Sequence, residues 1–144
     1  MPEDAKRILD SVIQLWNTGD SEVAKKLYSD NARRYDPNQP EPGRGPQEIS
    51  RYIAEVRTAY PDFHLEINES VQEGNLLVSH WTCTGTHRGK FLGMPPTGRG
   101  ITIRGLTLGR IEDGKITEEY VYFDRLTMLE QLGLASNVGH RSAQ

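Results

Sequence analysis

Three side chains in the C-terminal half of the chain have the chemistry needed to move a proton. Glu119 stands in a stretch rich in β-branched and aromatic residues, 116–123. If that stretch lines a pocket, desolvation raises the carboxyl pKa toward neutrality, which suits a general acid or base. His80 and Asp124 are weaker catalytic candidates, because a lone strand histidine is often structural and Asp124 can simply cap the helix that follows it.

The orientation of His80 depends on which face of the predicted strand 76–87 meets the pocket. If the even-numbered residues face inward, His80 can pair with a substrate oxygen or with Glu119. If the odd-numbered residues face inward, Ser79, Trp81 and Cys83 line the pocket instead. The sequence leaves both arrangements open, because successive side chains of a strand point to opposite faces.

Other chemistries lack their sequence signatures. No GxSxG, HExxH, P-loop, GxGxxG or CxxC motif occurs, and the glycine-rich stretch 88–100 does not have the spacing of a phosphate loop. Cys83 is the single cysteine, which excludes an internal disulfide and any multi-cysteine zinc site. We therefore predict no metal site.

Composition predicts one domain over residues 1–144 in the cytoplasm. Seventeen basic and twenty acidic residues leave a net charge of −3, which argues against a nucleic-acid partner. No apolar stretch is long enough to span a membrane, and the N-terminus, MPEDAKRILD, is too charged for a secretory signal. The mean hydropathy of −0.63 still leaves enough apolar residues for one core.

Hydrophobic periodicity predicts the elements that must position the candidate residues. Apolar residues at helical spacing indicate three helices before residue 61, and alternation then indicates antiparallel strands. The predicted helices cover 3–17, a short segment after Asp20 or Ser21, and 46–60, with a Pro- and Gly-rich loop at 35–46. The predicted strands begin at Phe63 and cover 76–87, 101–111 and 116–123, followed by a short helix after Asp124 and a loose tail at 134–144. Helices followed by a run of strands indicate the α+β class.

Five stretches together resemble the SnoaL-like polyketide cyclase family of the NTF2-like superfamily. They are WNTGD (16–20), YPDF (60–63), GTHRGKFLGMPPTGR (85–99), RIEDGKI (110–116) and DRLTMLEQLG (124–133). The resemblance implies a cone-shaped α+β barrel, with three N-terminal helices packed on a curved antiparallel sheet and a short C-terminal helix. It also implies a homodimer or tetramer, an apolar pocket, and no metal or organic cofactor.

The resemblance also identifies two positions of interest. The family's ring-closing cyclases use a His on one strand and an Asp on the last strand, and those positions correspond to Thr107 and Val121 here. Neither side chain can carry out the proton transfer. We therefore expect the family fold without the ordinary cyclase reaction.

The turn between the last two strands determines which residues share a face. A two-residue turn at 113–114 pairs Thr107 with Tyr120. A three-residue loop at 112–114, with its glycine as a bulge residue, pairs Thr107 with Glu119. We predict the three-residue loop, because it places Thr107 and Val121 on one face as the family's catalytic pair requires.

That face is the predicted pocket wall, and its middle positions are small. Its members are Ile103, Gly105, Thr107, Gly109, Thr117, Glu119, Val121 and Phe123. The opposite face carries Leu106, Leu108, Tyr120 and Tyr122, an apolar surface that predicts a homodimer or larger oligomer.

The remaining predicted substrate contacts lie in two loops and one strand. Asp36 stands in the loop near the pocket mouth, and Trp81 stands in strand 76–87. Phe91 and Met94 belong to the long connection at 88–100, where they can cover the pocket or pack at a subunit interface. The predicted substrate-binding residues are thus Thr107, Val121, Trp81, Phe91, Met94 and Asp36.

The sequence favours an enzyme that acts on a small apolar, polyketide-like substrate. The expected chemistry is acid–base catalysis without a cofactor, namely cyclisation, isomerisation or hydration, with Glu119 as the main group. Two alternatives remain, a hydroxylase-like member that needs a reductase partner and a non-catalytic small-molecule-binding module.

Overall fold

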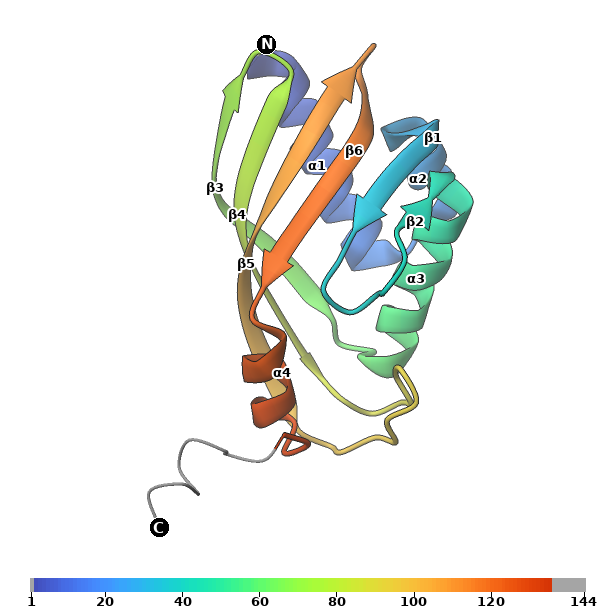
Figure 1. Ribbon diagram of the computed structural model, residues 1–144, viewed down its shortest axis with the longest axis vertical. Coiled ribbons are helices and arrows are strands. Elements are labelled where there is room, and N and C mark those ends of the chain that lie inside the picture. Colours follow the sequence, from blue (N-terminus) through green and yellow to red (C-terminus); the bar gives the residue numbers. More distant parts are fainter. Residues whose placement is uncertain (1, 136–144) are drawn as a thin grey trace.

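The strands form one curved, six-stranded sheet in the order β2-β1-β6-β5-β4-β3, with helices against its concave face (Figure 1). The computed structural model describes residues 2–135, so positions 136–144 of the predicted loose tail lie outside the described residues. The elements are α1 (Pro2–Thr18), α2 (Ser21–Leu27), β1 (Tyr28–Tyr35), β2 (Gly43–Arg44), α3 (Gly45–Ala59), β3 (His64–Glu73), β4 (Leu76–Thr86), β5 (Gly100–Glu112), β6 (Lys115–Phe123) and α4 (Arg125–Gln131). Within residues 2–135, no helix combines the length and apolar character needed to cross a membrane.

Local signals explain where the helices begin. The Asp20 side chain accepts a hydrogen bond from the backbone N–H of Glu22 at 2.9 Å and so caps α2. Pro46 stands in the first turn of α3, where its missing N–H has no intrahelical partner to lose. Ile8, on the apolar stripe that the periodicity predicts for α1, is fully buried, and so is Leu15, which that predicted stripe did not include.

Strand β1 is the main element that the sequence analysis missed. It pairs in parallel with β6, so the sheet is mixed rather than antiparallel as predicted. The buried positions of β1 include Tyr28, Ala32 and Arg34, which do not produce the alternation of large apolar residues by which a strand is recognised. The β1–β6 register sets Arg34 beside Glu119, which positions the central ion pair of the site.

The predicted three-residue loop between β5 and β6 is wrong. Asp113 and Gly114 form a two-residue turn with φ angles of 51° and 75°, which is the type I′ geometry that an Asp-Gly pair favours. The register then shifts, because Arg110 pairs with Glu118 and leaves Thr117 as an extra residue on β6. This bulge makes Thr107 the direct partner of Val121.

Thr107 and Val121 therefore share a face of the sheet as predicted, although a bulge at Thr117 produces this register rather than a three-residue loop. Thr107, Glu119 and Val121 all line the concave side of the sheet. Thr117 is the exception, because it is the bulged residue, and Ile116 is buried in its place.

The apolar core has two parts that meet at α1. One part gathers around α1, α2 and the adjoining ends of β1 and β6, and the other around the C-terminal half of α3, the loop at 87–99 and α4. Val12 and Trp16 pack against both parts. The Asn17 side chain ties the end of α1 to the sheet by two hydrogen bonds with the backbone of Leu65, at 2.8 and 3.1 Å.

Candidate functional site

A largely apolar cavity lies between the helices and the concave face of the sheet. The cavity volume is about 110 Å³. Charged, amide and hydroxyl side chains are few in its wall and come from β1, the loop after it, α3, β4, β5 and β6. They are Arg34, Asp36, Asn38, Tyr52, Tyr60, Ser79, Thr107 and Glu119. An apolar cavity with a few convergent polar groups is the usual form of a small-molecule site.

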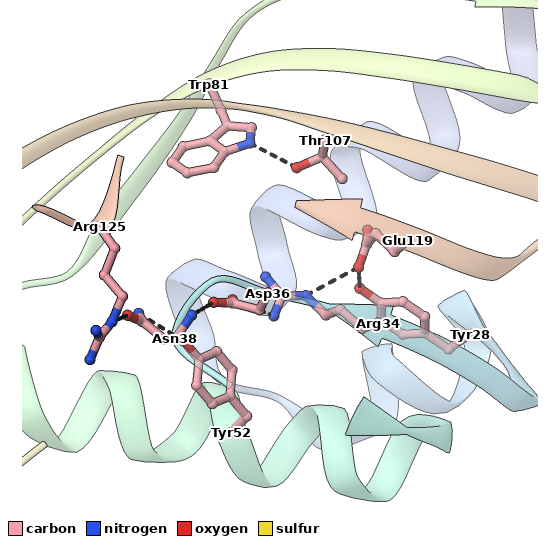
Figure 2. Close-up of polar contacts among 9 residues, drawn as sticks. All are labelled: Tyr28, Arg34, Asp36, Asn38, Tyr52, Trp81, Thr107, Glu119 and Arg125. Carbon is pink, nitrogen blue, oxygen red and sulfur yellow. Dashed lines mark hydrogen bonds and ion pairs between the residues drawn. The ribbon is translucent and has the colours of Figure 1, made fainter. Parts of the chain in front are cut away.

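A buried ion-pair cluster occupies one side of the cavity (Figure 2). Arg34 is only 5% exposed, and its guanidinium contacts the carboxylates of Asp36 at 2.8 Å and Glu119 at 3.3 Å. The same guanidinium lies 5.0 Å from the ring centroid of Trp16 and 5.5 Å from that of Tyr52, within the range of cation–π attraction. One cation therefore serves two carboxylates, and the cluster carries a net negative charge when both are ionised.

The two carboxylates differ in how many of their oxygens are occupied. Asp36 Oδ2 meets Arg34 Nη1, and Asp36 Oδ1 accepts from the backbone N–H of Asn38 at 2.7 Å. Glu119 uses Oε1 for both of its contacts, accepting from the Tyr28 hydroxyl at 2.6 Å and facing Arg34 Nε. No hydrogen bond or ion pair from the described side chains reaches Glu119 Oε2. Glu119 is therefore the carboxylate with an oxygen available to a ligand.

The protonation chemistry of the cluster follows from its burial. Burial raises the pKa of Glu119 above its ordinary value, and Arg34 and Tyr28 offset part of that rise. Burial alone would lower the pKa of Arg34, but Asp36 and Glu119 raise it, so the guanidinium stays charged. Burial also raises the pKa of Tyr28 well above its ordinary value, so its hydroxyl remains a donor. Glu119 is thus a carboxyl whose protonated form is favoured by burial.

His80 is not part of the site. Its side chain is 40% exposed and meets Glu69 at 3.4 Å, on the face of β4 that points away from the cavity. The odd-numbered residues Ser79, Trp81 and Cys83 line the cavity, which settles the orientation of the strand. Burial raises the pKa of the Cys83 thiol to about 12, so it is uncharged and a poor nucleophile.

Asp124 is the N-cap of α4. Its two oxygens accept from the backbone N–H and the hydroxyl of Thr127, at 3.2 and 2.9 Å. These hydrogen bonds lower the pKa of its carboxyl, and the residue does not line the cavity. The alternative role that the sequence suggested is the one that the structure shows.

Most of the predicted substrate contacts line the cavity, and one does not. Asp36, Trp81, Phe91, Thr107 and Val121 are all in its wall. Met94 is half-buried outside the wall.

A tight turn accounts for the position of Met94. Phe91 and Met94 exchange backbone hydrogen bonds across residues 92 and 93, which have φ angles of 51° and 79°. The turn directs Phe91 into the cavity and leaves Met94 packed against the apolar cluster around it. The position therefore does not support the predicted substrate contact of Met94.

The sequence analysis missed Tyr28, Arg34, Asn38 and Tyr52. The Asn38 amide donates to the Tyr52 hydroxyl at 3.2 Å and accepts from Arg125 Nε at 3.1 Å, joining the loop after β1 to α3 and α4 (Figure 2). The one sequence signal for this cluster is the Arg34-x-Asp36 spacing, which places opposite charges on the same face of a strand. That signal requires β1 to be recognised first.

Among the described residues, no group of three or more His, Cys, Asp or Glu side chains is arranged to hold a metal ion. The donor set of the cavity is instead two carboxylates that already share a guanidinium. The carboxylate and hydroxyl side chains of the cavity can transfer protons and form hydrogen bonds.

Comparison with known proteins identifies relatives over most of the chain. The family model of the SnoaL-like polyketide cyclases matches residues 6–132. The aklanonic acid methyl ester cyclase DnrD of Streptomyces peucetius is 29% identical over 128 residues, covering 85% of this chain and 86% of the cyclase. The nogalonic acid methyl ester cyclase of Streptomyces nogalater is 31% identical over 90 residues, covering 62% of this chain and 67% of that enzyme.

Solved structures confirm the predicted cone fold. TsrD from Streptomyces laurentii matches with a TM-score of 0.83 at 23% identity, over 92% of this chain and 97% of TsrD, which is evidence for the fold alone. Wild-type IdmH from Streptomyces antibioticus matches with a TM-score of 0.75 at 28% identity, over 90% of this chain and 98% of IdmH.

Proposed function

Since the chain belongs to the SnoaL-like polyketide cyclase family, we propose that it catalyses proton transfer on a small, largely apolar, polyketide-like substrate. Glu119 is the general acid or base in this proposal. The observation that carries it is the free Oε2 of a carboxylate that is 5% exposed and whose other oxygen is held by Tyr28 and Arg34. A fixed carboxylate with one free oxygen in an apolar cavity is suited to take a proton from carbon.

The proposed step begins at a C–H bond next to a substrate carbonyl. Glu119 Oε2 takes the proton, and the electron pair of the broken C–H bond forms an enolate. In a cyclisation, the enolate carbon bonds to a second carbonyl carbon, and the resulting alkoxide takes the proton back from Glu119. In an isomerisation, the proton returns to a different carbon of the same enolate. Both reactions restore the carboxylate and need no further reactant.

Asp36 has a supporting role in this proposal. Both of its oxygens are occupied, so it neutralises Arg34 in part and leaves Glu119 incompletely compensated. The residual negative charge and the burial together favour a proton on Glu119. The cluster can thus hold the proton between its removal and its return.

Exchange of carbon-bound hydrogen tests the proposed step without knowledge of the natural substrate. Bicyclic ketones such as 2-tetralone are incubated with the protein in D₂O, and NMR follows the loss of the acidic C–H signal. We expect exchange above the buffer rate, saturating with ketone concentration and inhibited by non-exchanging ligands of the cavity. Exchange at the buffer rate for ketones that calorimetry shows to be bound would refute the proposed proton transfer.

We also expect little or no turnover of aklanonic acid methyl ester, the substrate class named for the Streptomyces peucetius relative. The positions that correspond to the family's His and Asp hold Thr107 and Val121, and loss of a general acid–base group typically costs about 10²–10⁴-fold in rate. The measurement compares this protein and DnrD side by side by product chromatography. Equal rates in the two proteins would contradict this expectation and show that Glu119 or another group supports the ordinary reaction. A Thr107→His, Val121→Asp double variant should turn over the ester faster than the wild type only if the ester fits in the cavity.

We propose in addition that the convex face of the sheet pairs with a second copy of the chain. Leu106 and Tyr122 are direct partners on β5 and β6, and they are 48% and 63% exposed. Exposed apolar surface of this kind usually marks an interface. Light scattering at micromolar concentration should give a mass above 16.3 kDa, and a Tyr122→Glu variant should lower it. A monomer at high concentration would contradict the pairing.

A further inference from the structure

The Trp81 indole lies against Gly105 on the neighbouring strand. Trp81 on β4 and Gly105 on β5 are direct partners in the sheet, and a side-chain carbon added to Gly105 would lie 2.6 Å from Trp81 Cη2. Real side chains essentially never approach so closely, so the indole occupies the space above Gly105 that any other residue would fill. Its ring centroid lies 6.3 Å from that of Phe123 on the next strand.

Thr107 holds the indole in this position. Trp81 Nε1 donates a hydrogen bond to Thr107 Oγ1 at 2.8 Å, as Figure 2 shows. Thr107 follows Gly105 by two residues, so both lie on the concave face of β5. The indole is thus fixed by close contact of its six-membered ring with Gly105 and by the hydrogen bond from its N–H to Thr107.

In this arrangement, the part of the indole that can contact a ligand is its aromatic face. Trp81 is half-buried and lines the cavity. Its N–H is already satisfied by Thr107, so it has no hydrogen bond left to donate. What remains is a rigid aromatic face, which stacks on flat unsaturated rings in preference to puckered saturated ones.

We propose that Trp81 is a specificity-determining residue, whose indole face stacks on a planar conjugated ring of the ligand, and that Thr107 is its positioning residue. The proposal rests on the proposed function, because it concerns the same cavity and names the shape of the ring that enters it. It also gives Thr107 a role of its own, since its oxygen is engaged with Trp81. Glu119 lies on the same concave wall, two residues from Val121, the partner of Thr107. A ring stacked on Trp81 can therefore present its edge to the carboxylate.

Two matched probes measure this preference directly. Calorimetry gives the dissociation constants of 2-naphthol, which is planar, and of trans-decahydro-2-naphthol, its saturated analogue with the same carbon skeleton and hydroxyl. The quantity of interest is the ratio of the two constants. Because this ratio is compared between variants, the difference in hydrophobicity between the probes cancels.

We expect Trp81→Leu to lower the preference for the planar probe by about threefold to tenfold, the value of aromatic stacking beyond burial. Thr107→Val removes the hydrogen-bond acceptor while keeping the side-chain volume, and it should lower the preference by a smaller factor. Thr107→Ser keeps the hydroxyl and should show the wild-type preference for the planar probe. A merely structural role of Thr107 would weaken both probes equally.

Two results would overturn the proposal. The first is a Trp81→Leu variant that prefers the planar probe as strongly as the wild type does. The second is a Thr107→Val variant with the wild-type preference, and this second test remains available if Trp81→Leu does not fold. Glu118→Gln, on the outer face where Glu118 pairs with Arg110, should keep the wild-type preference. If exchange fails in every test while the preference follows Trp81, the proposed proton transfer is wrong and the stacking role stands.

Discussion

Replacing Arg34 with methionine should destabilise the fold by about 3–5 kcal/mol at pH 7, because it leaves two buried carboxylates without a cation. Asp36 loses its 2.8 Å partner and Glu119 its 3.3 Å partner. Methionine still packs against the rings of Trp16 and Tyr52, so the loss reports mainly on charge. The measurement is the free energy of unfolding by urea denaturation.

The pH dependence of the stability lost in Arg34→Met shows whether Arg34 stabilises the fold by its charge or by its packing. Removing the cation raises the folded-state pKa of Glu119 further above its unfolded value. A raised carboxyl pKa penalises folding above the unfolded value and not below it, so the loss should be largest at pH 7 and shrink as the pH falls below about 5. Arg33→Met is the matched control, since the Arg33 guanidinium donates to a backbone carbonyl at 3.3 Å and forms no ion pair with a side chain in the described part of the chain, and it should change stability by less than about 0.5 kcal/mol. A loss that is independent of pH would mean that Arg34 acts through packing.

Replacing Glu119 with glutamine should lower the rate of ketone hydrogen exchange by about 10²–10⁴-fold, because the amide cannot take up a proton. The substitution keeps the shape of the side chain and an oxygen that can accept from the Tyr28 hydroxyl. Glu118→Gln makes the same chemical change one residue away, on the outer face, where Glu118 pairs with Arg110 at 2.9 Å. That control should keep the wild-type rate. Equal losses in the two variants would contradict the assignment of Glu119.

The stability of Glu119→Gln should be equal to or higher than that of the wild type at pH 7. The wild-type carboxyl has a raised pKa in the folded state, so its ionisation weakens the fold as the pH rises above the unfolded value of about 4.5. Glutamine does not ionise, so the variant lacks this penalty. Below about pH 4 the wild-type carboxyl is protonated, and the difference should vanish. A wild-type Glu119 that titrates by NMR at or below its ordinary pKa would remove the electrostatic basis of the acid–base assignment.

Elements with local signals were predicted closely. The apolar stripe that contains Ile8, Val12 and Trp16 predicts α1, and Asp20 and Pro46 mark the starts of the next two helices. Alternation predicted β3 to β6. In β4 and β5 the apolar residues fill a buried face, whereas in β3 the signal is the alternation around Leu65 and Ile67, of which only Leu65 is buried. Strand β1 escaped detection because an arginine and an alanine fill buried positions, and they are acceptable there only in the assembled molecule.

The site was predicted in part for the same reason. Glu119 was identified from its neighbours in the sequence, and the structure places it in the cavity wall. Its partners Tyr28 and Arg34 are 91 and 85 positions away in the chain, so no local pattern connects them with it. The face of His80 was undecidable, because strand 76–87 has both polar and apolar residues on each of its two sides.

The sequence by itself determined the family, the α+β class, the helix boundaries and the carboxylate on which the proposed chemistry depends. These follow from residue types and short spacings, which local backbone preferences and periodicity convert directly into elements. The tertiary structure alone decided three further points: that Arg34 lies between Asp36 and Glu119, that a bulge at Thr117 sets Thr107 opposite Val121, and that Trp81 covers Gly105. Each depends on the register between strands or on contacts between distant segments, and a shift of one residue in register would turn every side chain to the opposite face.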